Sequence, residues 1–400
     1  MYLKAIFQIL TGSVVSQIVM FLSTFIIGLY YSKQDVGEFA LFSSYIAIGC
    51  IFTSLRLEQA ISKSQSQNEV VSAIDITLTS TAIISLLFGT VIIPIVASQG
   101  VTNTSIGIFL LTGTLVLTAT NVTNALLVYQ HKFKELSYSK IIKSAVFIMT
   151  LYPLSLVENG ILWSFTLSSS FLVIYSYKKA ELGYHLSIQR IKNSLLEIKH
   201  YEYIYKYSVP NACLNTFAQQ IPIISGAILY SPSVIGVYFF VDKILRTPAA
   251  VILQSLRPVL IRFYSNKNSS IRTYYIHSLL LMILGFVYTA IIYIIAYYAF
   301  SSSYMEKWQE GIEYIVPVLI IAFSQLTNTA SVPFLLVKKK TRSLLYTEIS
   351  NVALRLMVFI FALNSPTEPS EFFYYMSIIS ITILTMNVFI VKLSCGPKNE

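Results

Sequence analysis

The sequence predicts an all-α integral membrane protein with 12 transmembrane helices, arranged as two parallel-repeat bundles of six. Three observations predict this class. The 400 residues are 55% hydrophobic and only 12% charged, whereas soluble domains carry about 25% charged residues. The apolar residues form runs of about the 20 residues that cross a bilayer as a helix. The basic residues gather between alternate runs, which is the pattern that orients spanning helices.

Twelve segments are long and apolar enough to span a membrane. The runs lack the alternation of a β-strand, so helices are expected. The first run is longer than the apolar part of a signal peptide, and it is predicted to stay as a spanning helix. The segments are roughly 5–30, 39–55, 70–98, 105–129, 140–157, 160–177, 207–229, 234–261, 275–300, 312–336, 343–364 and 371–393.

The positions of Lys and Arg predict that both termini are cytoplasmic. In this orientation 23 of the 28 basic residues fall in inner loops and tails, and the outer loops hold only Lys33 and Lys307. The net charge of +10 is then a topology signal facing anionic lipid, and no nucleic-acid partner is expected.

An internal repeat predicts two equivalent halves. YSKQDVGEF at 31–39 and YSPSVIGVY at 230–238 share Tyr-Ser, a β-branched residue, Gly and an aromatic residue, at an offset of 199. Six predicted spans separate these points, so the halves share one orientation, as in transporters with a substrate site between repeats. The predicted domains are an N-terminal bundle at 1–177, a cytoplasmic amphipathic linker at 178–206, a C-terminal bundle at 207–393 and a cytoplasmic tail at 394–400. A plain solvated linker is the alternative at 178–206.

Neither a metal site nor an enzyme is expected. The four histidines and three cysteines are scattered without ligand spacing, so no metal, cofactor or disulfide is predicted. The extramembrane segments are too short to hold a soluble catalytic domain.

Three basic residues, Lys243, Arg246 and Arg355, are predicted deep inside spans. A charge at the bilayer centre costs at least ~2.5–3.5 kcal/mol, so it faces a partner or a wet cavity. At 1.5 Å per residue, Lys243 and Arg355 both lie ~14 Å below the outer surface. In one interpretation Asp242 neutralises Arg246, Glu348 neutralises Arg355, and the pairs tie helices together. In the other, the excess of cations forms a cavity for an anionic ligand.

Polar residues at helical spacing extend this hypothesis. Asn211, Asn215 and Gln219 are four apart, and Asn121 belongs to a stripe with Thr114, Thr118 and Asn124. Such stripes either form hydrogen bonds between helices or line a hydrated cavity. A cavity would place Asn121, Asn211, Asn215 and Gln219 against the substrate.

The N-terminal region resembles that of bacterial O-antigen flippases. The resemblance is carried by TGSVVSQIVMFLSTFIIGLYYSKQDVGEFALFSSY at 11–45 and SLRLEQAISKS at 54–64. Within them it rests on Gly12, Gln17, Tyr30 or Tyr31, Gly37 with Phe39, and RLEQAI at 56–61. It is specific over about the first 60 residues and architectural beyond them. These proteins are polysaccharide transporters of the superfamily that includes multidrug and toxic-compound extruders (MATE and MOP proteins).

The resemblance implies a flippase of the bacterial cytoplasmic (inner) membrane. It would move undecaprenyl-diphosphate-linked oligosaccharide to the outer leaflet by alternating access, with H⁺ or Na⁺ coupling and with polysaccharide polymerase and other assembly proteins as partners. Related lipid II flippases carry arginines in their first two helices, whereas this chain has none there before Arg56. The intramembrane cations are therefore expected only in the second half.

The resulting hypothesis assigns roles to the charged residues. Lys243, Arg246 and Arg355 would hold the diphosphate, and the acids Asp242, Glu348 and Asp75 are candidates for ion coupling. The first alternative is a cation-coupled multidrug antiporter, for which an acidic cavity is expected. The second is an O-antigen polymerase, an enzyme, for which a large outer loop is expected, whereas the longest outer loop here has about a dozen residues.

Overall fold

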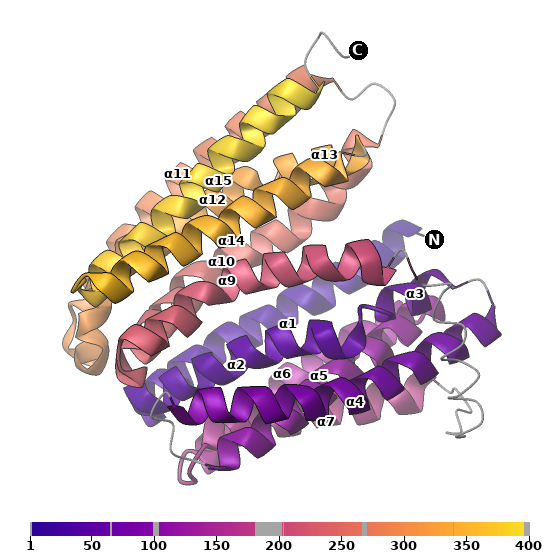
Figure 1. Cartoon of the computed structure of the whole chain (residues 1–400), viewed down its shortest axis with the longest axis horizontal. Coiled ribbons are helices and arrows are strands. Elements are labelled where there is room, and N and C mark those ends of the chain that lie inside the picture. Colours follow the sequence, from indigo (N-terminus) through magenta and orange to yellow (C-terminus); the bar gives the residue numbers. More distant parts are fainter. Residues whose placement is uncertain are drawn as a thin grey trace. The chain divides into compact units, whose positions relative to one another are not determined.

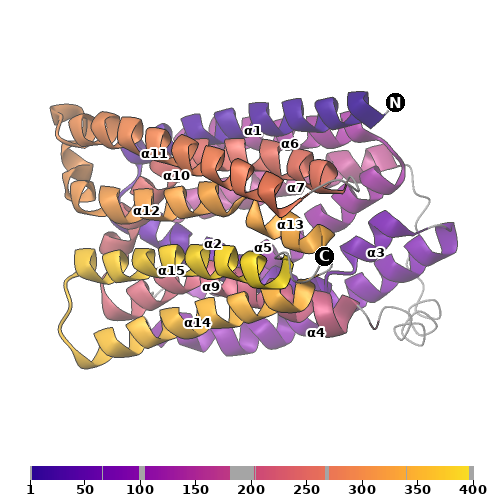
Figure 2. The same ribbon diagram turned by 90° about the horizontal axis from the view of Figure 1, so that it is seen from above.

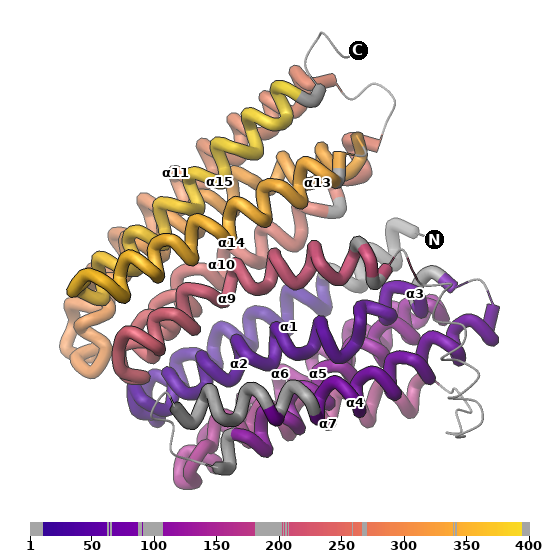
Figure 3. The backbone as a smooth tube through the Cα atoms, viewed as in Figure 1, coloured from indigo at the N-terminus to yellow at the C-terminus, as the bar shows by residue number. Residues whose placement is uncertain are grey.

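The computed structural model is helical throughout the residues that it describes, with short connectors. These residues are 2–64, 66–98, 104–180, 202, 204–265, 270–338 and 340–395, and Figure 3 traces the backbone through them. The chain folds as two compact units, residues 1–217 and 218–400.

The N-terminal unit is built around α5, which packs against α2, α3, α4 and α7. Outside this group α1 lies along α6, and α6 lies along α7; Figure 2 shows α1 and α6 side by side. Gly12 allows the close approach of α1 and α6, because a Cβ atom there would lie 2.3 Å from the Cβ of Ser137. The elements are α1 (Tyr2–Tyr30), α2 (Lys33–Ser54), α3 (Glu58–Lys63), α4 (Gln67–Ser98), α5 (Thr104–Tyr129), α6 (Phe133–Leu154) and α7 (Gly160–Ala180).

The C-terminal unit has α12 at its centre, in contact with α10, α11 and α15, while α14 pairs with α15 (Figure 1). A π-helical turn at Ile204–Ser208 precedes α9, which begins in the first unit and ends in the second. The elements are α9 (Val209–Leu229), α10 (Pro232–Tyr264), α11 (Ile271–Phe300), a 3-10 helix (Ser303–Gly311), α12 (Ile312–Asn328), α13 (Ser331–Val337), α14 (Thr341–Asn364) and α15 (Pro369–Cys395).

Each predicted span corresponds to a helical element in the described residues, and the protein is a multi-pass membrane protein. Eleven of these elements are long and apolar enough to cross a membrane, rather than the predicted 12. The exception is α6, because it begins at Phe133 instead of residue 140 and so includes four charged residues. The predicted span at 312–336 is interrupted between α12 and α13. Most of the predicted linker, residues 181–201, lies outside the described residues.

The repeated Tyr-Ser sequence has an equivalent contact in each unit. Tyr31 comes directly after α1, and its hydroxyl donates to the Leu151 carbonyl at 2.6 Å, close to the connection between α6 and α7. Tyr230 comes directly after α9, and its hydroxyl donates to the Thr367 carbonyl at 3.1 Å, in the connection between α14 and α15. Thus, in each unit, the connector after the first long helix (α1 or α9) is hydrogen-bonded to the region that joins the fifth and sixth long helices (α6 and α7, or α14 and α15).

These two tyrosines are protonated donors at neutral pH. Burial raises the pKa of Tyr31 to about 12 and also raises the pKa of Tyr230. The following residues, Ser32 and Ser231, occupy the N-cap positions of α2 and α10. The Tyr-Ser pair shared by the two repeats therefore has a structural role in both units. The tyrosine forms a hydrogen bond to a distant part of its unit, and the serine occupies the N-cap position of the next helix.

Replacing Tyr31 with Phe should lower the free energy of unfolding by about 1 kcal/mol, because the hydrogen bond to Leu151 is buried. Tyr230→Phe should have a smaller effect, since its contact is only partly buried and water can replace the hydroxyl. Thermal unfolding in detergent measures both. Tyr152→Phe is the control, because Tyr152 is exposed; a Tyr31→Phe protein as stable as the wild type would contradict this role.

Candidate functional site

The predicted ion pair on α10 is present. Arg246 Nη1 lies 3.1 Å from Asp242 Oδ1, one helical turn away on the same face. Asp242 is buried, whereas the Arg246 side chain is 32% exposed. The pair therefore neutralises one of the three predicted cations and leaves part of its guanidinium accessible.

Lys243 also lies on α10, three residues before Arg246, and is exposed. Its Nζ is 4.8 Å from the centre of the Phe239 ring, a cation–π contact that stabilises an ammonium group without neutralising it. No ion pair of Lys243 occurs among the described residues. Lys243 interacts electrostatically with both Asp242 and Arg246, so it belongs to the same group of charges.

Arg355 is buried between α14 and α15 and is held by neutral groups. Its Nε donates to Asn351 Oδ1 at 2.9 Å, and its Nη2 donates to Ser380 Oγ at 3.0 Å. Only 6% of the residue is exposed. The predicted partner Glu348 attracts Arg355 electrostatically, but no ion pair within 4 Å joins them in the described part of the chain. A buried guanidinium is thus solvated by an amide and a hydroxyl.

The two arginines belong to one electrostatic cluster in the C-terminal unit. Arg246 repels Arg355, and both interact with the buried phenol of Tyr238. That phenol stacks on Phe373 with ring centres 3.7 Å apart, which holds α10 against α15. The predicted cations are Lys243, Arg246 and Arg355, and the predicted acids are Asp242 and Glu348. Together these five side chains carry a net charge of about +1.

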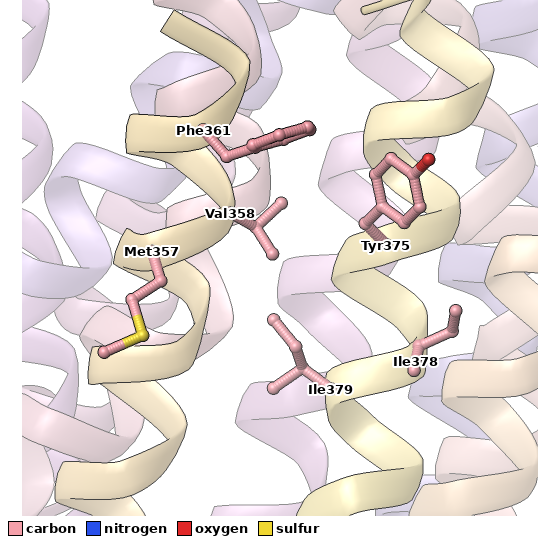
Figure 4. Close-up of a pocket in the computed structure, with 6 residues that line it drawn as sticks. All are labelled: Met357, Val358, Phe361, Tyr375, Ile378 and Ile379. Carbon is pink, nitrogen blue, oxygen red and sulfur yellow. The ribbon is translucent and has the colours of Figure 1, made fainter. Parts of the chain in front are cut away.

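An apolar groove of about 490 Å³ lies next to Arg355, along the seam of α14 and α15. Val358 of α14 and Ile379 of α15 point toward each other across it (Figure 4). Val358 is one helical turn beyond Arg355, and Ile379 precedes its hydrogen-bond partner Ser380. The structure thus combines a buried cation with a hydrocarbon-like surface. The groove is lined by Met357, Val358, Phe361, Tyr375, Ile378 and Ile379.

The predicted polar stripes differ in their surroundings. Asn211, Asn215 and Gln219 all lie on an exposed face of α9. In contrast, the amide of Asn121 donates to Cys50 Sγ at 3.3 Å, across the contact between α5 and α2. Thr118 joins the same contact, with its hydroxyl 2.9 Å from that of Thr53. The stripe on α5 therefore forms hydrogen bonds between helices, while the three residues of α9 lie at an exposed surface.

Asp75 lies apart in sequence and in fold from the other predicted acids. It is fully buried on α4 in the N-terminal unit, whereas Asp242 and Glu348 belong to the C-terminal unit. Its helix neighbours Ala73 and Ile74 pack in an apolar cluster with α5.

The sequence reasoning missed two basic residues in the N-terminal unit. Lys140 and Lys143 are half-buried on α6, whereas the sequence hypothesis counts both with the inner loops, at the inner end of the span predicted from residue 140. The expectation that intramembrane cations occur only in the second half stays a prediction, because α6 is not among the helices that are apolar enough to span a membrane. Because α6 begins at Phe133, Lys143 lies in the middle of a 22-residue helix. The available signal was the continuation of helical spacing through the basic segment that precedes residue 140.

Replacing Asp242 with Asn should destabilise the protein by about 1–3 kcal/mol, because it leaves the charge of Arg246 without its carboxylate. The double variant Asp242→Asn/Arg246→Gln removes both charges and should recover most of this loss. Thermal unfolding of the wild type, both single variants and the double variant measures the coupling. Additive effects of the two substitutions would show that the pair contributes nothing.

No protein-family model and no curated protein matches the sequence, but solved structures match the fold. One is the inward-facing conformation of a multidrug resistance MATE family transporter of the MOP superfamily, with 11% identity and a TM-score of 0.67 over 95% of this chain and 94% of that chain. Another is the lipid II flippase MurJ in an inward closed conformation, with 13% identity and a TM-score of 0.71 over 96% and 87%. A third is MATE in complex with MaL6, with 14% identity and a TM-score of 0.59 over 98% and 96%. The chain therefore has the fold of MATE and MOP transporters.

Proposed function

We propose that this protein is a flippase that moves undecaprenyl-diphosphate-linked O-antigen oligosaccharide from the inner to the outer leaflet of the bacterial cytoplasmic membrane. The observation that carries the proposal is Arg355, a buried guanidinium with neutral partners beside an apolar groove. A diphosphate joined to a long hydrocarbon chain matches both features. The lipid II flippase MurJ shares the fold, and the N-terminal sequence resembles O-antigen flippases.

The proposed mechanism assigns the diphosphate to Arg355 and Arg246. Arginine can bind phosphate oxygens through two parallel hydrogen bonds, and Arg246 keeps part of its guanidinium accessible beside Asp242. Lys243 would attract the anion from outside α10. The hydrocarbon chain would lie in the groove between α14 and α15, because its six lining side chains are almost entirely apolar.

The sugar would contact the open polar face of α9, where Asn211, Asn215 and Gln219 offer amide donors and acceptors. Asn121 would act indirectly in this scheme, because its amide binds Cys50. Alternating access would expose the site to each leaflet in turn, with both termini in the cytoplasm. Proton or Na⁺ coupling would involve Asp75, Asp242 or Glu348.

A cation-coupled multidrug antiporter is the second candidate, because MATE transporters share the fold. A drug cation would need an excess of carboxylates in the site, whereas the predicted residues around Arg355 have a net positive charge. The two functions differ in what their loss causes in the cell. Loss of the flippase leaves lipid-linked sugar in the inner leaflet, and loss of the antiporter raises drug sensitivity.

Replacing Arg355 with Gln should lower transport of the lipid-linked sugar by about 10- to 100-fold, since a charge-assisted contact with phosphate is lost. Combining it with Lys243→Gln and Arg246→Gln should abolish surface polysaccharide and accumulate lipid-linked sugar in the inner leaflet. The measurement is complementation of a strain that lacks the gene, with lipid-linked sugars extracted from the cells.

The control removes three exposed basic residues of the same unit, with Arg272→Gln, Lys340→Gln and Arg342→Gln. It changes the net charge equally, and transport should stay within about twofold of the wild type. Protein level and thermal unfolding are compared in all variants. Normal surface polysaccharide in a folded Lys243/Arg246/Arg355 triple variant would refute the proposed site, and drug sensitivity without a glycan defect would favour the antiporter.

A further inference from the structure

Two lysines of α6 form a basic pair inside the N-terminal unit. Lys140 Nζ donates to Ser13 Oγ of α1 at 2.9 Å. Lys143 Nζ lies 4.8 Å from the centre of the Phe165 ring of α7. Because the two residues are three apart on a helix, they share one face of α6. The ammonium groups therefore lie where α6 meets α1 and α7.

These contacts leave both positive charges without a counter-charge. A serine hydroxyl and an aromatic ring are neutral, and no ion pair of either lysine occurs in the described part of the chain. Both residues are half-buried, so each keeps some surface that a ligand can reach. Two like charges one turn apart on a helix repel each other, and a bound anion would relieve this repulsion.

Lys143 has a counterpart in the C-terminal unit. It lies on α6, the fifth long helix of its unit, and contacts Phe165 of the sixth. Arg355 lies on α14, the fifth helix of the other unit, and donates to Ser380 of the sixth. In each unit, therefore, a cation of the fifth helix is turned toward the sixth and held there by neutral groups.

We propose that Lys140 and Lys143 form a second anion site, within the N-terminal unit, that binds the phosphate groups of the lipid-linked substrate. The proposal rests on the proposed function for the nature of the lipid. Two ammonium groups one turn apart can each donate to oxygens of one diphosphate. Binding exchanges their serine and ring contacts for charge-assisted hydrogen bonds. The protein thus holds a basic subsite in each repeat, one built from lysine and one from arginine.

Binding to the purified full-length protein in detergent tests the site directly. The probes are undecaprenyl diphosphate, phosphatidylglycerol and inorganic pyrophosphate, measured by native mass spectrometry in the Arg355→Gln background, which removes the other subsite. The double variant Lys140→Gln/Lys143→Gln should weaken binding of undecaprenyl diphosphate by about tenfold or more. Lys134→Gln is the matched control, because Lys134 lies on the same helix, is exposed, and has a similar ring contact with Tyr138 at 5.6 Å.

Each outcome of this experiment decides the proposal. Weaker binding of undecaprenyl diphosphate in the double variant, with Lys134→Gln unchanged, supports it. Equal loss of phosphatidylglycerol binding would show a general headgroup site and overturn the assignment to substrate, as would binding of pyrophosphate alone at the same strength. Unchanged binding in a folded double variant would overturn the site itself.

A second measurement separates ligand binding from a structural role. Replacing Lys143 with Met removes an uncompensated charge and keeps the length of the side chain, so the midpoint of thermal unfolding should rise without ligand. The stabilisation by undecaprenyl diphosphate should be lost in the same variant. A purely structural lysine would give a lower midpoint with ligand stabilisation intact, and that result would refute the proposal. Lys134→Met should change neither quantity.

The failure of this inference can be told apart from failure of the proposed function. If Arg355→Gln stops transport in cells while Lys140→Gln/Lys143→Gln leaves both binding and transport intact, only the second site is refuted. If the lysine pair binds undecaprenyl diphosphate but deletion of the gene causes no accumulation of lipid-linked sugar, the binding site holds and the proposed transport is refuted.

Discussion

The structure depends on how charged side chains are accommodated in helices that face hydrocarbon. An ion in such surroundings needs a counter-charge, a polar partner or water, and the protein uses a different solution at each position. Arg246 has a carboxylate, Arg355 has an amide and a hydroxyl, and Lys143 has an aromatic ring. The last two solutions hold the side chain in place but leave its charge available, which is the property that a carrier of an anionic lipid requires.

The second constraint is that long apolar helices must approach closely without a hydrophobic driving force between them. Small residues and short hydrogen bonds provide this in both units. Gly12 brings α1 against Ser137 of α6, and Gly113 lies against Phe42 in the contact of α5 with α2. The tyrosines after α1 and α9 then bind backbone carbonyls near the junction of the fifth and sixth helices. Because each unit contains this tyrosine hydrogen bond at the equivalent position, the short sequence repeat has a structural role within each unit.

The fold is supported by solved structures, whereas the proposed function is supported by the charged side chains of this chain. Solved MATE structures and MurJ share the architecture over nearly the whole chain at 11–14% identity, which is enough to establish the fold. A multidrug resistance transporter and a lipid II flippase share this architecture, so a proposal about the substrate has to rest on the charges that a given chain places inside its helices. Here those charges are predominantly basic in both units, with Asp75 as the buried acid of α4. The basic excess is what favours a phosphate-bearing substrate.

The sequence by itself determined the helical membrane class, the positions of most helices and the division into two halves, because long apolar runs and the distribution of Lys and Arg depend only on local composition. It also paired Asp242 with Arg246, since their spacing of four fixes them on one helical face. The tertiary structure decided what each side chain meets. It set Lys243 over the ring of Phe239, directed Asn121 to Cys50 and put Arg355 against Ser380. It also extended α6 back to Phe133, which places Lys140 and Lys143 well within the helix rather than at its inner end. Such outcomes depend on neighbouring helices that are distant in sequence, and no local pattern specifies them.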